Sequence, residues 1–228
     1  MSDVLVSIII VNYNTCSLTC ACIDSIFQRV YSCNFEVILV DNASSDNSVV
    51  EIKRRYASTV KLVASDSNLG FGRANNLGVK YASGQYLFLL NSDTILENDP
   101  FPYFFEFFHT RENLGALGTY LKDGNGIYTK SGGKFYSMSK YLMMGVKKLF
   151  FVSSNEEIPL SNASYKVEYV IGADLFISKE LFEEIGMFNK HIFMYFEDVE
   201  LCKRLYDAGY YSYLIPGPQI IHFVKSSS

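Results

Sequence analysis

Apolar runs separated by polar turns dominate the first part of the chain. The run at residues 86–90 has no polar interruption, which predicts a strand covered on both faces, as in a mostly parallel sheet. Comparable runs predict strands at 4–11, 35–40 and 60–64. Because helical patterns lie between these runs, the alternation predicts an α/β fold with parallel strands and right-handed crossovers.

Three helices are predicted between these strands. Apolar residues that repeat every four positions predict the first helix at about 17–28. The second is predicted at 47–56, where Ser48 and Glu51 have the spacing of a capping box. The third is expected to end at Gly84, because glycine commonly stops a helix.

The pattern becomes less regular after the strand at 86–90. Residues 101–109 are strongly aromatic, which predicts a helix packed in the core. Residues 115–130 predict a hairpin around Asp123. The remaining predictions are a strand region at 165–177, helices at 179–185 and from Glu197, and strands at 210–215 and 219–223. We therefore expect a small, mixed C-terminal part.

The segment 139–152 mixes apolar side chains with Lys147 and Lys148. This combination could form an amphipathic patch for an acceptor lipid or for the membrane surface, which would give peripheral membrane association. A mobile lid or a core helix fits the same pattern. The sequence leaves these alternatives open.

The composition indicates a folded chain without a global basic field. With 228 residues, 49% of them hydrophobic, the chain can bury a sizeable core as one large domain. The formal net charge is -4, so nucleic acid is not an expected partner, and anionic ligands must be held by local groups.

No targeting or membrane-spanning segment is evident in the sequence. The first apolar run follows no Lys or Arg and lacks a small-residue cleavage site. No run approaches the ~20 apolar residues that a membrane span requires. The five cysteines, an odd number, fit a reducing compartment. We expect a cytoplasmic protein, which could act at the inner face of the membrane.

Polar residues follow each of the predicted parallel strands. Asn12, Asp41 and Asp93 come directly after strands, and Asn68 follows the strand at 60–64. The carboxyl ends of parallel strands meet at one edge of a sheet, so these side chains are expected to converge there. A carboxylate held by a rigid strand could bind a cation or a phosphate-bearing ligand, although Asn and Asp are also ordinary turn formers.

Four stretches lie at or after the ends of the predicted strands, at residues 8–14, 40–48, 68–78 and 89–94, and they contain Asn-Tyr-Asn, Val-Asp-Asn, Asn-Leu-Gly-Phe and Asn-Ser-Asp-Thr. In their order and spacing, these stretches resemble the nucleotide-sugar half of inverting family 2 glycosyltransferases with the GT-A fold. The variant with Asn-Leu-Gly-Phe and Asn-x-Asp-Thr is most similar to the rhamnosyltransferase-type branch. The resemblance covers nearly the whole chain. It implies a Rossmann-like, mostly parallel sheet flanked by helices, in a single domain at 1–228.

The same resemblance divides this domain into two functional halves. Residues of about 1–98 would bind the nucleotide sugar, and residues of about 99–228 would bind the acceptor and carry the catalytic group. The Glu-Asp pair in the second half would supply the base. Asp198 fits this role best, with Glu197 as an orienting neighbour or the alternative base. The helix dipole is expected to keep Asp198 ionised.

The resemblance also implies a metal site and donor contacts. Asp93 and His222 would hold Mg²⁺ or Mn²⁺ against the leaving pyrophosphate. Asp41 would accept a hydrogen bond from the nucleobase. The further residues expected to bind the donor are Asn12, Asn14, Asn68, Arg73, Asn91 and, as a phosphate contact, Lys225. Asn91 replaces the first acid of an Asp-x-Asp motif, which lowers the charge of the site, so we expect weaker metal binding.

The implied activity is transfer of a sugar from a dTDP- or UDP-linked donor, with inversion, in cell-surface polysaccharide synthesis. The acceptor would be a hydroxyl of a saccharide or of a lipid-linked saccharide. A nucleotidyltransferase is one alternative, but it should carry a Gly-rich basic loop after the first strand, where this chain has Asn-Tyr-Asn-Thr. A non-catalytic sugar-nucleotide binding module is the other, and the intact Glu197-Asp198 pair argues against it. Relatives commonly continue beyond the residue that matches His222, so this chain could be truncated.

Overall fold

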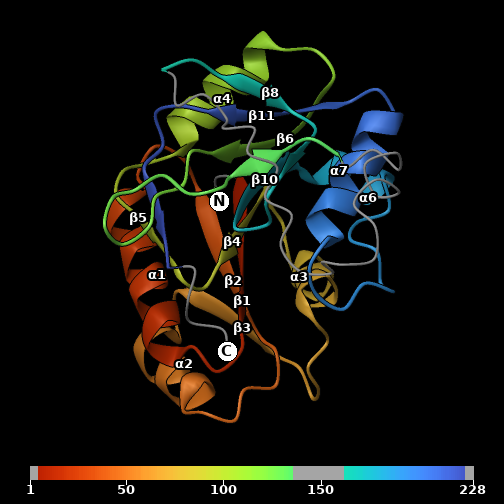
Figure 1. Cartoon of the computed structure of the whole chain (residues 1–228). Coiled ribbons are helices and arrows are strands. Elements are labelled where there is room, and N and C mark those ends of the chain that lie inside the picture. The colour runs from red at the N-terminus through yellow and green to blue at the C-terminus, as the bar shows by residue number, and fades with distance from the viewer. Residues whose placement is uncertain (1–4, 136–161, 224–228) are drawn as a thin grey trace, which may run out of the picture.

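The computed structural model describes residues 5–135 and 162–223. The segment 139–152 and Lys225, both singled out in the sequence, lie outside these ranges. Within them, the chain forms one eight-stranded sheet in the order β3-β2-β1-β4-β10-β6-β11-β8, with helices on both faces (Figure 1). The predicted α/β fold with a mostly parallel sheet is confirmed. In the described ranges, no helix has the length and apolar character needed to cross a bilayer.

Four parallel strands make up the first part of the sheet. They are β1 (Val6–Asn12), β2 (Phe35–Asp41), β3 (Val60–Ala64) and β4 (Tyr86–Asn91). In the register, Asn12 lies opposite Asp41, and Val11 lies opposite Asn91. The carboxyl ends of β1, β2 and β4 therefore align at one edge of the sheet.

The second part of the sheet contains two strands that run in the reverse direction, β8 and β10. Its strands are β6 (Leu114–Thr119), β8 (Tyr165–Val167), β10 (Asp174–Ser178) and β11 (Tyr211–Ile215). Strand β10 runs antiparallel to β4, with Asp174 opposite Leu90. As a result, the chain enters β10 at the edge where β4 ends.

Two small antiparallel sheets complete the strand structure of the described residues. Strand β5 (Thr94–Leu96) pairs with β12 (Ile220–His222), and β7 (Gly132–Gly133) pairs with β9 (Tyr169–Val170). The first pairing places His222 opposite Thr94. It thereby brings a residue near the end of the chain beside the turn that follows β4.

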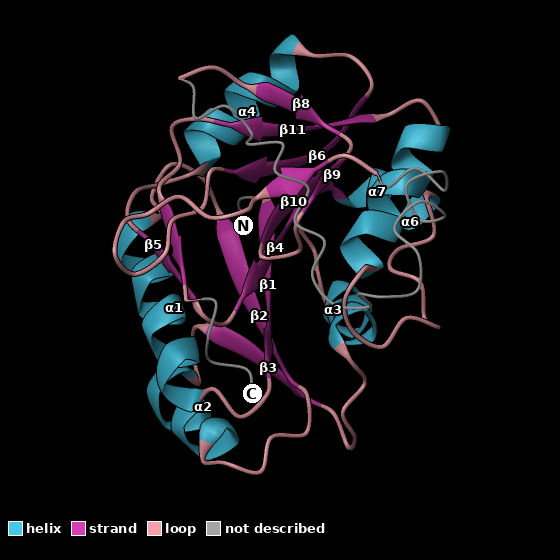
Figure 2. Ribbon diagram, viewed as in Figure 1, coloured by secondary structure: helices cyan, strands magenta, loops and turns pink. Residues whose placement is uncertain are grey.

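The helices form two layers around the large sheet (Figure 2). One layer contains α1 (Cys16–Arg29), α2 (Ser48–Tyr56) and α4 (Phe101–Thr110), and the other contains α3 (Phe71–Val79), α6 (Lys179–Glu184) and α7 (Glu197–Asp207). Ile8 and Ile10 belong to the core cluster of the first layer, whereas Ile9 belongs to that of the second. This alternation follows from the two-residue period of a strand, and both layers need apolar side chains.

The aromatic helix α4 packs in the core, as its composition predicts. Phe101 and Phe104 are fully buried. The ring of Phe104 stacks on Phe176 of β10, with centroids 4.5 Å apart and planes 5° apart. Aromatic rings at this separation add attraction beyond the area they bury, so α4 holds the reversed strand in place.

The third helix ends earlier than predicted. α3 stops at Val79, so Gly84 is not its stop signal. A Cβ atom at Gly84 would lie 2.6 Å from the backbone nitrogen of Ser7. Glycine is needed there because the segment before β4 approaches β1 closely, not because a helix must end.

One further local prediction is wrong in its bounds, and another is wrong altogether. Residues 114–119 do not form half of a hairpin but pair with β10 and β11 in the large sheet, because this fully buried run needs cover on both faces. The hairpin around Asp123 is present in a shorter form. Lys122 pairs antiparallel with Tyr128, Thr129 N donates to the Leu121 carbonyl at 2.9 Å, and Gly126 N donates to the Asp123 carbonyl at 2.9 Å in the turn. The capping box at α2 is also absent, since Glu51 pairs with Arg54 at 2.6 Å.

Candidate active site

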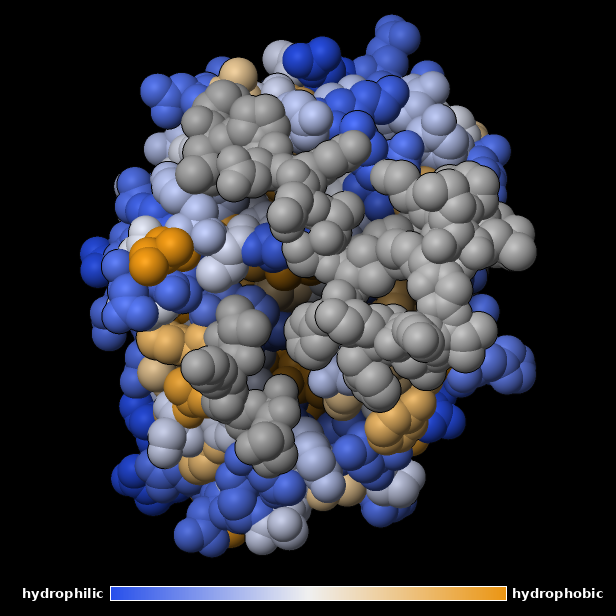
Figure 3. Space-filling model, viewed as in Figure 1, coloured by the Kyte–Doolittle hydropathy of each residue, from blue (hydrophilic) through white to orange (hydrophobic). Residues whose placement is uncertain are grey.

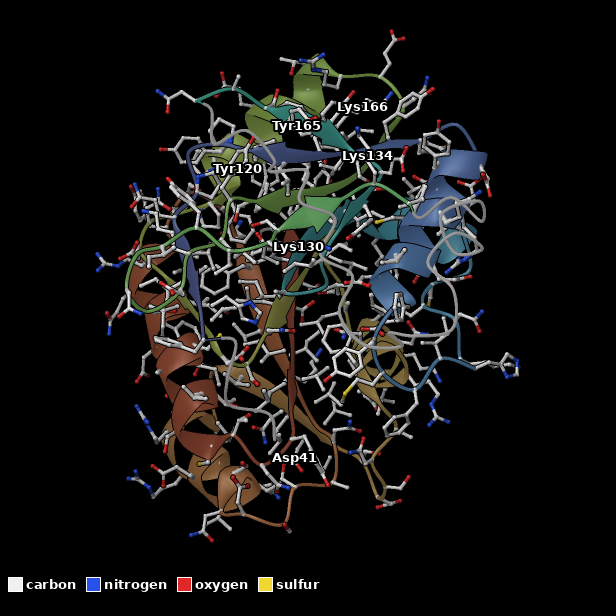
Figure 4. All side chains as sticks on the ribbon, in the orientation of Figure 1. Asp41, Tyr120, Lys130, Lys134, Tyr165 and Lys166 are labelled. Atoms are coloured by element: carbon white, nitrogen blue, oxygen red, sulfur yellow. The ribbon has the colours of Figure 1, made fainter. Side chains whose placement is uncertain are left out.

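Buried hydrogen bonds join the carboxyl ends of β1 and β2. Asn12 Nδ2 donates to Asp41 Oδ1 at 2.7 Å and to Ser44 Oγ at 2.9 Å. The second oxygen of Asp41, Oδ2, accepts from Ser44 N at 3.0 Å. Asn12 and Asp41 therefore converge as expected, and each Asp41 oxygen has one lone pair left for a ligand. Figure 4 shows Asp41 at the lower end of the sheet.

The neighbouring loops are tied to this pair by asparagines. Asn14, at a φ of 56°, accepts from Ser45 N through its side-chain oxygen at 2.7 Å. Asn42 Nδ2 donates to Asn68 Oδ1 at 2.9 Å, and Asn42 N donates to Asn12 O at 2.8 Å. Asn68 is thus connected to Asn12 through Asn42, a residue that the sequence prediction did not include. Its only sequence signal was its place directly after Asp41.

Asp93, in the turn that follows β4, lies beside His222 of β12. Their closest atoms, Asp93 Oδ1 and His222 Nε2, are 3.3 Å apart, and each side chain is partly exposed, 15% and 12% respectively. Asn91 Nδ2 lies 3.2 Å from the same His222 nitrogen. The pairing of β5 with β12 creates this cluster. Because Asn91 carries an amide, one donor faces the ring where a carboxylate would place an acceptor.

This cluster fits two ligands of a divalent cation. Oxygen and nitrogen ligands at about 2.1 Å around an octahedral ion lie roughly 3 Å from one another, close to the observed separation. No group of three or more His, Cys, Asp or Glu side chains arranged to hold a metal occurs in the described residues, so the remaining ligands would come from phosphate and water. His222 Nδ1 is buried and has no hydrogen-bond partner in the described part of the chain, although metal-bound histidines usually have one.

The acidic pair begins helix α7. Asp198 Oδ2 accepts from Gly172 N at 2.9 Å, and its Oδ1 accepts from Val199 N at 2.7 Å. These two backbone bonds fix the orientation of the carboxylate. Glu197 is 6% exposed, and its Oε2 has no hydrogen-bond partner among the described residues. The two acids therefore occupy different environments, one anchored at both oxygens and one buried with an unsatisfied oxygen.

Burial dominates the titration of both acids. Together with a smaller contribution from the neighbouring Asp198 carboxylate, it raises the pKa of Glu197 to about 7. Burial also raises the pKa of Asp198, while the amides of Gly172 and Val199 and the charge of Lys130 oppose it. Burial thus acts against the expected effect of the helix dipole. A raised pKa makes a carboxylate a stronger proton acceptor.

The start of β10 bridges the cation cluster and the acidic pair. Gly172 N binds Asp198, and the next residue, Ala173, accepts from Asn91 N through its carbonyl at 2.9 Å. The reversed direction of β10 makes this bridge possible, because it brings residues 172–173 to the edge where β4 ends. No feature of the local sequence predicts this role of Gly172.

Lys130 and Arg73 take different positions. Lys130 lies near Asp198, as its effect on the pKa of that carboxyl indicates, with Nζ 5.7 Å from the centre of the Tyr169 ring (Figure 4). A lone lysine in a turn carries no sequence signal for this placement. Arg73 Nε donates to the Leu69 carbonyl at 2.6 Å, and in the described part of the chain no hydrogen bond or ion pair joins it to the other predicted residues.

Four exposed apolar side chains precede the acidic pair. They are Phe193, Met194, Tyr195 and Phe196. Tyr195 and Phe196 have φ angles of 63° and 66°, a left-handed conformation that non-glycine residues rarely adopt outside functional sites. On the face shown in Figure 3 the surface is mostly hydrophilic, with hydrophobic side chains in small patches. A continuous apolar loop beside two carboxylates is a candidate binding surface.

A surface hollow of about 470 Å³ lies between α1 and α2, lined in part by Cys16, Asp24 and Arg55. None of the predicted site residues lines it. Its cation, Arg55, is paired with Asp24 at 2.6 Å. The candidate site residues therefore lie at the carboxyl edge of the sheet and not around this hollow.

Comparison with known proteins places the chain in a family. Residues 7–186 match the model of Glycosyl transferase family 2. The chain is 25% identical over 207 residues to Glycosyltransferase GlyG of Streptococcus pneumoniae, covering 89% of this chain and 65% of that protein. It is also 25% identical over 208 residues to N-acetylglucosaminyl-diphospho-decaprenol L-rhamnosyltransferase of Mycobacterium tuberculosis, covering 84% and 67% of the two chains. The chain spans about two thirds of the length of these relatives.

A solved structure shows the same fold. The crystal structure of GalNAc-T7 with UDP, GalNAc and Mn²⁺ superposes with a TM-score of 0.72 and 15% identity, over 97% of this chain and 44% of that chain. The expected GT-A fold and the resemblance to the rhamnosyltransferase branch are both confirmed. With the family model matched over most of its length, this chain belongs to glycosyl transferase family 2.

Proposed function

We propose that this chain transfers a sugar from a nucleoside diphosphate sugar, with inversion, to a hydroxyl group of a saccharide or lipid-linked saccharide. The observation that carries the proposal is the bridge at the start of β10. Gly172 N binds Asp198, and Ala173 O binds the backbone of Asn91, two residues before Asp93. A proton acceptor and a pair of cation ligands are thereby held at one edge of the sheet, as displacement of a diphosphate requires.

The donor would lie over the ends of β1, β2 and β4. Asp41 has lone pairs free to accept from a base imide, which supports a uracil or thymine nucleotide, and Asn12, Asn14 and Asn68 would shape the pocket around it. The solved relative GalNAc-T7 holds UDP, which agrees with this class of donor. Arg73 and Lys225 remain predicted donor contacts.

Asp93 and His222 would hold Mg²⁺ or Mn²⁺. A bound divalent cation neutralises the charge that builds up on the leaving diphosphate. The separation of 3.3 Å between the two side chains and the Mn²⁺ in the GalNAc-T7 structure support this assignment. The amide of Asn91 gives the site less negative charge than a second carboxylate would, so the affinity for the cation should be modest.

The transfer itself needs one proton acceptor. The acceptor oxygen attacks the anomeric carbon and forms the new C–O bond. The bond from that carbon to the diphosphate oxygen breaks, and its electron pair leaves with the nucleoside diphosphate. The hydroxyl proton passes to the Asp198 carboxylate, whose orientation the backbone amides of Gly172 and Val199 fix. Attack from the face opposite the leaving group inverts the anomeric centre.

The acceptor would approach over the exposed loop at 193–196. Its apolar surface beside the acidic pair suits an acceptor with an apolar part, and the Mycobacterium tuberculosis relative is named for a diphospho-decaprenol acceptor. Such an acceptor would bring the protein to the inner face of the membrane in cell-surface polysaccharide synthesis. We keep the division into a donor half at about 1–98 and an acceptor half at about 99–228 within one domain as part of this proposal.

The substitution Asp198→Asn tests the mechanism. Removing a general base typically costs roughly 10² to 10⁴ in rate, so the turnover of sugar transfer should fall by that factor. The affinity for UDP or dTDP with Mn²⁺, measured by calorimetry, should stay the same. Asp207→Asn is the matched control, because Asp207 is exposed at the other end of α7 and should leave turnover unchanged. Normal turnover in the Asp198 variant would move the role of base to Glu197.

The stereochemistry of the product gives a second, independent test. Proton NMR of the glycoside formed from an α-linked or β-linked donor reports the anomeric configuration of the new bond. Direct displacement predicts the opposite configuration to that of the donor. A product with the donor's configuration would rule out the single-displacement mechanism, whatever the effect of Asp198→Asn.

A further inference from the structure

The loop before the acidic pair is fastened to helix α3 at two points. Phe71 N, in the first turn of α3, donates to the Phe193 carbonyl at 3.1 Å. Further along the helix, Asn76 Nδ2 donates to the Phe188 carbonyl at 2.8 Å, and Phe188 N donates back to Asn76 Oδ1 at 3.1 Å. Helix α3 also contacts α7 directly, and Figure 1 shows both on the same side of the sheet. The segment between Phe188 and Phe193 is therefore held at both ends.

Two glycines of the Asn-Leu-Gly-Phe-Gly stretch allow this close approach. A Cβ atom at Gly70 would lie 2.0 Å from the Phe193 carbonyl oxygen and 2.8 Å from its carbonyl carbon. A Cβ atom at Gly72 would lie 3.0 Å from Phe188 Cβ and 3.6 Å from Glu197 Cβ. At Gly70 the obstacle is backbone, which cannot rotate aside as the end of a side chain can.

A shift of the Phe193 backbone would also move the carboxylates of Glu197 and Asp198. Phe193 is close in sequence to Glu197, and the residues between them include Tyr195 and Phe196 in the left-handed conformation. Such backbone persists only where its surroundings fix it. Here the fixed points are the Phe193 carbonyl on α3 and the Phe196 carbonyl, which accepts from Glu200 N at 2.9 Å in the first turn of α7.

The same glycine is connected to the donor side of the site. Gly70 N donates to Asn68 Oδ1 at 2.9 Å, and that oxygen also accepts from Asn42 Nδ2 at 2.9 Å. Asn42 N in turn donates to the carbonyl of Asn12. Hydrogen bonds therefore run from the predicted nucleoside pocket to the residue that faces Phe193.

We propose that Gly70 and Gly72 are positioning residues, which set the place of the Glu197-Asp198 pair relative to the donor pocket through close contact with Phe193, Phe188 and Glu197. This inference rests on the proposed function, because it assumes that the pair supplies the base. It gives the Gly-x-Gly of α3 a role other than phosphate binding. The glycines act on catalysis through the loop at 188–196 and touch no substrate.

The first test compares alanine substitutions at two glycines that share a positive φ. Gly70 and Gly126 both have a φ of 78°, but the added Cβ meets Phe193 at Gly70 and nothing within 4 Å at Gly126. Gly126→Ala controls for a positive φ without a contact. Gly70 also has a ψ of 168°, which essentially only glycine adopts, so the loss in Gly70→Ala combines this local strain with the contact at Phe193, and Gly72→Ala, whose φ is not left-handed, separates the two. Misplacing a catalytic group by about 1 Å can cost about 100-fold in rate, so kcat should fall by that factor in Gly70→Ala only. The affinity for UDP with Mn²⁺ should be unchanged in both.

A fluorescence measurement follows the loop without any reaction. The chain contains no tryptophan, so Tyr195→Trp would introduce a single emitter at an exposed position of the loop. In this background, Gly70→Ala should shift the emission maximum, and Gly126→Ala should not. If Gly70→Ala fails to fold, Gly72→Ala replaces it, because its φ is not left-handed and its 3.0 Å contact is milder. An unshifted emission with normal kcat overturns the inference.

A double-variant cycle separates this inference from the proposed base. If the glycines act through Asp198, combining Gly70→Ala with Asp198→Asn should cost no more than Asp198→Asn alone. Losses that add, or a Gly70→Ala effect confined to donor affinity, would overturn the positioning role while the base stands. If Asp198→Asn keeps full turnover, the proposed base fails by itself. The cycle is then made with Glu197→Gln, where additive losses would again overturn the inference.

Discussion

Asp174, the first residue of β10, is a fully buried carboxyl group. Its Oδ2 accepts from Thr119 N at 2.8 Å and from Thr119 Oγ1 at 2.5 Å. Its Oδ1 has no hydrogen-bond partner in the described part of the chain. Burial raises the pKa of Asp174 to about 8, against which the two bonds from Thr119 act. The group is therefore a neutral acid at neutral pH, and ionising it is costly.

This group should make the protein less stable as the pH rises. The ordinary pKa of an aspartate is about 3.9, so between roughly pH 4 and pH 8 the native state binds more protons than the unfolded state. The free energy of unfolding must then fall across this window. Asp174→Asn should remove that contribution. Urea unfolding at several pH values should show that the free energy of unfolding of the variant increases relative to that of the parent as the pH rises. The same pH dependence in both proteins would contradict the assignment.

The sequence predicted individual site residues unevenly. Asn12, Asp41, Asn68 and Asp93 could be assigned to one edge, because each follows a strand of a parallel series. Nothing in residue spacing could bring His222 to Asp93, and only the family resemblance paired them. The contacts of Gly70 and Gly172 were missed because what packs opposite a glycine is not contained in the local sequence.

At the scale of elements, helix α4 offers a clear measurement. Phe104 is fully buried and stacks on Phe176. Phe104→Ala should lower the free energy of unfolding by about 3–5 kcal/mol, because it removes buried apolar surface and leaves a cavity. Glu106→Ala is the control on the same helix, exposed and expected to change stability by less than about 0.5 kcal/mol. Equal effects of the two substitutions, measured by urea unfolding, would show that α4 does not anchor β10.

Strands with long apolar runs were predicted well. Short strands, and strands whose pairing partners lie far along the sequence, were not. Strands β1 to β4 were expected near their observed bounds because each is an apolar run between turns. Strands β5 and β12 are three residues each, too short to show a period, and they exist through their pairing with each other. The run 114–119 was assigned to a hairpin because its partners, β10 and β11, lie far along the sequence.

At the scale of the whole molecule, the cation cluster depends on the pairing of β12, near the end of the described chain, with β5, which follows β4. Loss of an outer-shell partner of a metal typically costs about 10- to 100-fold in affinity, so Asp93→Ala or His222→Ala should weaken UDP binding by at least that much when Mn²⁺ is present. Calorimetry with excess EDTA should remove the difference from the parent.

The matched control for this experiment is His109→Ala, an exposed histidine on α4. It should bind UDP as the parent does, with or without Mn²⁺. Equal losses for the Asp93 and His222 variants in Mn²⁺ and in EDTA would refute the cation site and indicate a direct contact with the nucleotide.

The reversed strand β10 also has a consequence for protein synthesis. Strands β1 to β4 can pair as soon as they leave the ribosome, but β4 then has one free edge until β10 arrives, because Leu90 pairs with Asp174 more than 80 residues later. At about 5–20 residues per second, that interval lasts roughly 4 to 17 seconds. Exposed apolar strand edges recruit other chains, so nascent copies on one polysome are most prone to aggregate during this interval. The step that covers the edge also brings residues 172–173 to the end of β4, so the backbone that holds Asp198 is in place before Asp198 and His222 are synthesised.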